Sequence, residues 1–100
     1  MFLRPFEEIV PIKLREWIEK GEARLIDVRE LDEHTKIAIE GDELFPLSQF
    51  DPALIVPDGR KVVFYCRSGR RSADAAYLWS RYHGQTSYNL KGGILEWLKG

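Results

Sequence analysis

Short apolar runs alternate with helix-compatible stretches along this chain, and that alternation constrains the fold more than any other feature. Strand-compatible stretches occupy residues 25–28, 61–65 and 86–89, and the first two are mostly apolar. Each is separated from the next by residues with helical spacing or by turn signals. A parallel pair of strands needs a crossover connection, usually a helix, so this order favours a parallel sheet. The sequence therefore predicts an α/β fold.

The connecting stretches predict four helices, at residues 14–18, 31–36, 72–82 and 94–99. Glycines follow the first and third of them, at Gly21 and Gly84, where a left-handed residue often ends a helix. Residues 45–47 are expected to form a brief extended piece, and residues 57–59 a turn. The aromatic side chains expected to pack in the core or at its rim are Trp17, Tyr65, Trp79 and Tyr88.

Composition limits the organisation and the class of function. One hundred residues with 44% apolar character suit a single domain spanning residues 1–100. The net charge of -1 does not indicate a nucleic-acid surface, and no stretch has the length needed to span a membrane. Residues 1–5 lack the features of a signal peptide, so a cytoplasmic location is expected. With one cysteine, neither an internal disulfide nor a zinc site is expected.

The chain's one cysteine, Cys66, follows the apolar run at 61–65 and begins a segment rich in arginine. That segment reads Cys66-Arg67-Ser68-Gly69-Arg70-Arg71 and leads into a helix-compatible stretch. Backbone N–H groups of such a loop, and of the helix start, can converge on one point, where the guanidinium groups add positive potential. A thiol at that point loses its proton easily, because these groups stabilise the thiolate. The pattern predicts a nucleophilic cysteine acting on anionic substrates.

A lone cysteine after an apolar strand is often an inert packing residue. Arg67, Arg70 and Arg71 argue against it. Guanidinium groups beside a buried thiol would be costly to desolvate and would gain nothing by clustering there. We therefore expect a reactive Cys66, with a substrate-binding loop made of Arg67, Ser68, Gly69, Arg70 and Arg71.

Four segments resemble motifs of the rhodanese family of sulfurtransferases. Residues 66–71 are similar to that family's C-R-x-G-x-R active-site loop, and residues 25–30 resemble its L-[IL]-D-V-R-E strand end. Residues 89–97 resemble its closing L-x-G-G-[IFM]-x-x-W segment, and residues 38–47 align with its G-H-I-P-G-A-x-x-[IL]-P-L stretch. The resemblance covers residues 12–97 or so. It implies a three-layer α/β/α fold with a central, mainly parallel sheet.

The resemblance also implies an activity. In this interpretation Cys66 accepts sulfane sulfur from a donor such as thiosulfate, holds it as a persulfide, and passes it to cyanide or a cellular thiol. No cofactor and no metal are implied. Arg67 and Arg70 are expected to attract the donor dianion, and the family resemblance suggests Asp27 as the structural partner of Arg71.

Other positions near the expected site carry less specific expectations. Arg29, two residues after Asp27, is expected to support the pocket. The central segment has Ala38, Glu40 and Asp42 where the family usually has histidine, proline and alanine, which makes it more acidic than usual. The two histidines, His34 and His83, are expected on the surface or at helix ends, without a partner that carries chemistry.

Two alternatives to a freestanding sulfurtransferase remain. The first is a cysteine phosphatase or arsenate reductase, whose loop places its arginine seventh from the cysteine. Counted inclusively from Cys66, Arg71 is sixth and Ser72 is seventh, which favours a single sulfur atom over a tetrahedral oxyanion. The second is a persulfide carrier that docks with a partner sulfur-relay protein. It would need the same loop, so the sequence does not separate it from an enzyme.

Overall fold

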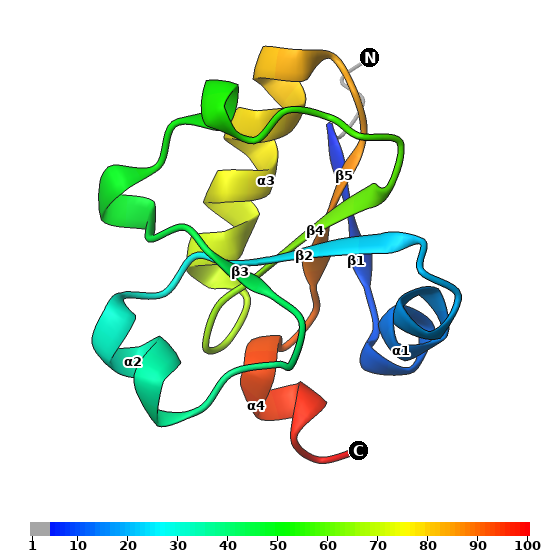
Figure 1. The fold of residues 1–100 in the computed structure, drawn as a ribbon, viewed down its shortest axis with the longest axis vertical. Coiled ribbons are helices and arrows are strands. Elements are labelled where there is room, and N and C mark those ends of the chain that lie inside the picture. Colours follow the sequence, from blue (N-terminus) through cyan, green and yellow to red (C-terminus); the bar gives the residue numbers. More distant parts are fainter. Residues whose placement is uncertain (1–4) are drawn as a thin grey trace.

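The computed structural model describes residues 5–100, so nearly all of the segment that bears on a signal peptide lies outside the described residues. Within residues 5–100, one parallel sheet contains β1 (Phe6–Ile9), β2 (Ala23–Asp27), β3 (Glu43–Leu44), β4 (Lys61–Tyr65) and β5 (Ser87–Leu90) (Figure 1). The strand order is β1-β5-β4-β2-β3, which places β4 at the centre. The predicted α/β fold with a parallel sheet is confirmed.

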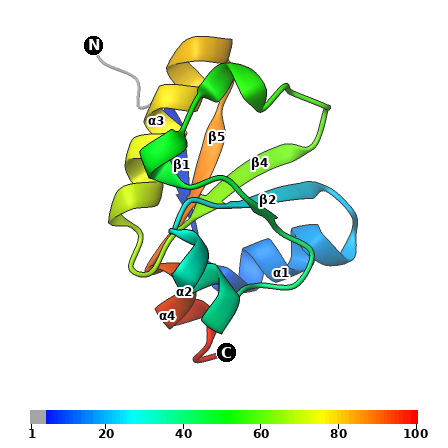
Figure 2. The same ribbon diagram turned by 60° about the vertical axis from the view of Figure 1, so that its left-hand side comes forward.

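Helices cover both faces of this sheet. Figure 2 shows α3 (Arg70–His83) on one side and α1 (Pro11–Glu19) on the other. The shorter helices are α2 (Leu31–Lys36) and α4 (Gly93–Trp97), and the 3-10 turns are η1 (Leu47–Gln49) and η2 (Pro52–Leu54). The arrangement confirms the expected three-layer α/β/α architecture. None of the helices within residues 5–100 has the length and apolar character needed to cross a bilayer.

Alternation along β4 divides the core into two clusters, because successive side chains of a strand point to opposite faces. The cluster on the α3 side includes Val62, Phe64, Cys66, Ala76 and Trp79. The cluster on the α1 and α4 side includes Leu14, Val63, Tyr65, Leu90 and Ile94. Cys66 therefore continues the even-numbered face of the central strand and points toward α3.

The predicted helices form with shifted ends. Gly21 has a left-handed φ of 70° directly after the C-cap of α1, as its position in the sequence predicts. A reciprocal pair of hydrogen bonds between Glu30 and Glu33 caps α2. The third helix begins at Arg70 rather than at residue 72, because Gly69 serves as its left-handed N-cap. Arg70 and Arg71 consequently belong to the first helical turn and not to the loop.

Strand β1 was not expected from the sequence, and β3 differs from its expected place. The adjacent residues Glu7 and Glu8 give β1 little apolar alternation, and its order comes from parallel pairing with β5, where Glu8 lies opposite Asn89. Strand β3 covers Glu43–Leu44, just before the expected extended piece at residues 45–47.

Candidate active site

Cys66 lies directly after β4, at the carboxyl end of the central strand, where parallel sheets bind ligands. Its residue surface is 1% exposed. The hydrogen-bond donors that face the sulfur include the N–H of Gly69 at 3.1 Å, the N–H of Ser72 at 3.4 Å and the hydroxyl of Ser72 at 3.2 Å. The loop and the first turn of α3 therefore form a cradle around Sγ.

This cradle changes the pKa of the thiol. Burial raises the pKa of Cys66, while hydrogen bonds from Ser72, and from the backbone N–H groups of Gly69 and Ser68, lower it. The hydrogen bonds outweigh burial, so the pKa of Cys66 lies below its ordinary value. A lowered pKa is expected of a reactive thiol, and it distinguishes Cys66 from a packing cysteine, whose pKa burial would raise.

Glycines allow the close approach on which the loop depends. A Cβ on Gly93, which has a φ of 64°, would lie 2.3 Å from the carbonyl oxygen of Arg67. The N–H groups of Ile94 and Leu95 donate to the carbonyl oxygens of Cys66 and Arg67, at 2.9 and 3.2 Å. The start of α4 thus packs against the backbone of the Cys66 loop and hydrogen-bonds to it. The glycine of the closing motif is needed because a side chain at Gly93 would prevent this contact.

The loop arginines divide into two kinds. Arg67 and Arg70 are exposed, and within residues 5–100 their side chains make no ion pair or hydrogen bond. Arg71 instead bonds Glu33 of α2 through both guanidinium ends, at 2.8 and 2.9 Å. These bonds lower the pKa of Glu33 to about 2, although burial opposes the shift. The predicted pairing of Arg71 with Asp27 is therefore wrong, because Glu33 is the acidic group within reach of Arg71.

Asp27 takes Arg29 as its partner. The two side chains are 0% and 3% exposed, and Arg29 Nη2 lies 2.7 Å from Asp27 Oδ2. Arg29 also donates to Asp27 Oδ1 through Nε at 2.9 Å and through its backbone N–H at 3.0 Å. Burial raises the pKa of Asp27, but the hydrogen bonds from Arg29 lower it more. The pKa of this carboxyl therefore lies below its ordinary value.

His34 lies in the last turn of α2, as the helix-end expectation had it, but unlike that expectation it has a buried acidic partner. Its Nδ1 lies 2.9 Å from Asp27 Oδ2 and 3.6 Å from Asp42 Oδ2. Asp42 accepts a hydrogen bond of 2.5 Å from the hydroxyl of Tyr65, and burial raises the pKa of Asp42. Asp27, His34 and Asp42 place potential metal-ligand atoms within 4.8 Å of one another. The Arg29 guanidinium, which occupies both oxygens of Asp27, opposes a cation there.

Sequence reasoning missed two buried polar residues beside the sulfur. Ser72 is 0% exposed and Asn89 is 2% exposed, and the Ser72 hydroxyl lies 2.5 Å from Asn89 Oδ1. Asn89 belongs to the closing motif, and Ser72 directly follows the loop. The available signals were therefore the position of Ser72 directly after the loop and that of Asn89 at the start of the closing motif.

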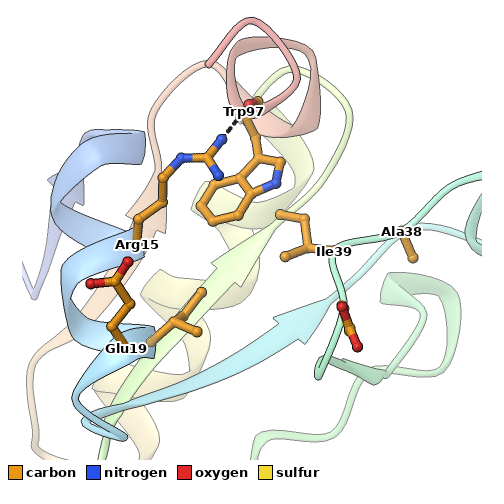
Figure 3. Close-up of a pocket in the computed structure, with 7 residues that line it drawn as sticks. Arg15, Glu19, Ala38, Ile39 and Trp97 are labelled. Carbon is orange, nitrogen blue, oxygen red and sulfur yellow. Dashed lines mark hydrogen bonds between the residues drawn. The ribbon is translucent and has the colours of Figure 1, made fainter.

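A separate cavity of about 520 Å³ lies on the opposite face of the sheet, between α1, α4 and the central segment (Figure 3). The guanidinium of Arg15 stacks on Trp97, 3.8 Å from the ring centroid, and donates to the Trp97 carbonyl. Ala38 and Glu40, two of the departures from the family pattern, line this cavity. The cavity lining includes neither Gly69 nor Ser72, the residues of the cradle around Sγ.

Comparisons with known proteins agree with this geometry. The rhodanese-like domain family matches residues 10–100. The probable adenylyltransferase/sulfurtransferase MoeZ of Mycobacterium tuberculosis is 35% identical, over 91% of this chain and 24% of that protein. A sulfurtransferase of Allochromatium vinosum is 32% identical, over 93% of this chain and 75% of that protein. The human thiosulfate:glutathione sulfurtransferase is 30% identical, over 87% of this chain and 89% of that protein.

A solved structure extends the likeness to three dimensions. The rhodanese-related protein of Thermoplasma volcanium superposes with a TM-score of 0.81 at 26% identity, covering 93% of this chain and 91% of that one. Relatives of similar length and relatives much longer than this chain thus share the same unit. The chain belongs to the rhodanese-like domain family, and its named relatives are sulfurtransferases.

Proposed function

We propose that this protein transfers sulfane sulfur from a thiosulfate-like donor to a thiophilic acceptor through a persulfide on Cys66. The supporting observation is the sulfur cradle, in which Gly69 and Ser72 direct donors at a buried Sγ. The Cys66 thiolate attacks the outer sulfur of thiosulfate, a new S–S bond forms, and the old one breaks. Its electron pair leaves with sulfite, and the negative charge of the thiolate moves to the outer sulfur of the persulfide.

Arg67 and Arg70 supply the attraction for the donor in this proposal. Both are exposed beside the loop and have no partner within residues 5–100. Arg70 also lies beside Arg71 in the first turn of α3, where cations are unfavourable for the helix dipole, and an anion at the same place would offset that cost. Arg71 is paired with Glu33 and serves instead to tie the first turn of α3 to α2.

The acceptor must come from outside, because the chain has no second thiol to take the sulfur from Cys66. The name of the human relative pairs thiosulfate with glutathione, which supports a small thiol as acceptor. The MoeZ relative carries this unit as 24% of a longer protein that is also named an adenylyltransferase. That arrangement supports the second candidate, a carrier that passes persulfide sulfur to a partner sulfur-relay protein.

Phosphatase chemistry finds less support. Its arginine would have to face the anion beside the thiolate, but Arg71 is bonded to Glu33 by both ends of its guanidinium. The loop also reaches that arginine one residue sooner than a phosphatase loop would. We therefore place sulfur transfer ahead of phosphoryl transfer.

Steady-state turnover tests the proposal. The protein should release sulfite from thiosulfate in the presence of cyanide and should hydrolyse an aryl phosphate negligibly. Cys66→Ser should abolish the transfer while circular dichroism shows an intact fold, since serine is nearly isosteric but a far weaker nucleophile. Slow turnover with stoichiometric sulfur loading would favour the carrier. Robust aryl phosphate hydrolysis without sulfur transfer would overturn the proposal.

A further inference from the structure

Asn89 is the buried residue that connects the side-chain and backbone donors of the sulfur cradle. Its Nδ2 donates to the carbonyl oxygen of Gly69 at 3.0 Å and to the carboxylate of Glu8 at 2.9 Å. Its Oδ1 lies 2.5 Å from the hydroxyl of Ser72, which itself lies 3.2 Å from Cys66 Sγ. A continuous chain of polar contacts therefore runs from β1 through β5 to the thiol.

The partners of the Asn89 amide determine its orientation. A carboxylate and a backbone carbonyl can only accept hydrogen bonds, so the group facing Glu8 and Gly69 must be the NH₂ of the amide. The oxygen Oδ1 must then face Ser72. Two oxygens 2.5 Å apart need a proton between them, and only the Ser72 hydroxyl can provide it.

That hydroxyl carries a single proton, whereas two acceptors lie within its reach. When Cys66 is a thiol, the proton points to Asn89 and the thiol can donate to the Ser72 oxygen. When Cys66 is a thiolate, the proton is drawn to the sulfur, and the contact between the Ser72 hydroxyl and Asn89 Oδ1 lengthens because no proton then lies between the two oxygens. We propose that Asn89 is a positioning residue that competes with the Cys66 sulfur for the Ser72 proton, which makes this hydroxyl a donor with two positions.

Such a donor suits a sulfur whose charge changes during the reaction. The role that follows rests on the proposed function. As Cys66 attacks the donor, its negative charge moves to the outer sulfur, and the Ser72 proton returns to Asn89 Oδ1. The Ser72 hydroxyl thus stabilises the thiolate before the attack without opposing the attack itself. The hydrogen bond that it loses to Cys66 Sγ is replaced by one to Asn89 Oδ1. Backbone donors from Gly69 and Ser72 stay in place throughout.

Several charged groups lie around the thiol, and they affect the pKa of Cys66 equally in every variant that retains them. Arg67 belongs to the loop and Arg70 and Arg71 to α3, Glu33 of α2 neutralises much of Arg71, and Glu8 of β1 faces Asn89. Differences between paired variants cancel these contributions. A double-mutant cycle on Ser72 and Asn89 therefore isolates the competition.

The experiment measures the midpoint pH of Cys66 alkylation by iodoacetamide in the full chain, where one cysteine gives one signal. The four proteins are the wild type, Asn89→Leu, Ser72→Ala and the double variant. Asn89→Leu removes the competing acceptor, so it should lower the midpoint pH of alkylation when Ser72 is present. This decrease should exceed the change that the same substitution causes in the Ser72→Ala background by about half a pH unit or more. A coupling of zero, or one of opposite sign, would overturn the proposal. It would leave sulfur transfer by Cys66 untouched, since alkylation involves no sulfur donor.

Controls separate positioning from simple destabilisation. Ser87→Ala removes another buried polar side chain from the same face of β5, one bonded to Ser80 and not to the loop. It should weaken folding and leave the midpoint unchanged, and an equal midpoint shift here would also refute the proposal. Asn89→Ala is the second variant, which avoids packing a leucine against Gly69, and it should show the same negative coupling with Ser72.

Discussion

Two Asp-x-Arg pairs in this chain share their local geometry and differ in burial. They therefore permit a matched test of how burial changes the contribution of such a pair to the free energy of unfolding. In Asp27-Val28-Arg29 and in Asp58-Gly59-Arg60, the arginine N–H donates to Oδ1 of the aspartate at 3.0 Å. In each, Nη2 lies 2.7 Å from Oδ2. The first pair is 3% and 0% exposed, and the second is 46% and 37% exposed.

Replacing each arginine by methionine should therefore have different consequences. Arg29→Met leaves the Asp27 carboxylate buried without its cation, and such a loss typically costs about 3–5 kcal/mol. Arg60→Met removes an exposed pair, worth about 0–1 kcal/mol. Because a domain of this size is stable by only about 5–15 kcal/mol, the first change should bring the protein close to unfolding.

Urea denaturation at neutral pH measures both variants against the wild type. Asp27 also gives a pH signature: its lowered pKa means that its contribution is complete above the unfolded-state value of about 3.9 and is lost as the pH falls through the lower folded-state value. In Arg29→Met, burial should raise that pKa above its unfolded-state value, so the carboxylate should destabilise the native state at neutral pH, and the stability of this variant should rise as the pH falls through the raised pKa. Equal free energies of unfolding for the two variants would refute the reasoning.

Three further predictions concern the cradle. The midpoint of Cys66 alkylation should lie below the free-thiol value of about 8.5, and a midpoint at or above that value would mean that the loop does not activate the thiol. Arg70→Ala should raise the KM for thiosulfate with little change in stability against urea. Arg71→Ala should lower the free energy of unfolding by about 0.5–1 kcal/mol, since the pair that Arg71 forms with Glu33 is partly exposed. Equal stabilities of the two variants would contradict this division of roles. Gly93→Ala places a Cβ 2.3 Å from the Arg67 carbonyl at a positive φ, so it should displace the loop and reduce transfer at least tenfold, and full activity would show that α4 does not support the loop.

The central part of the site could be predicted because it depends on neighbours in the sequence. The apolar run of β4, the cysteine, the glycine and the following helix are consecutive, so their order alone places Cys66 at the carboxyl end of a strand. The arginines that follow it were expected in the loop. Two of them instead begin α3, because Gly69 ends the loop early with its left-handed backbone.

Contacts between distant segments could not be predicted in the same way. Arg71 had acidic candidates in several segments, and only the position of α2 selects Glu33. The bond of His34 to Asp27 depends on how α2 lies against the end of β2. The contact between Ser72 and Asn89 needs α3 and β5 to meet, and β1 takes its order from the neighbouring β5.

Intact-protein mass spectrometry after thiosulfate treatment tests the central claim most directly. The native protein should gain the mass of one sulfur atom, and cyanide should remove it again as thiocyanate. Cys66→Ser, treated in parallel, should gain nothing, because no other cysteine is present. A native protein without added sulfur, or an equal gain in Cys66→Ser, would contradict a persulfide on Cys66.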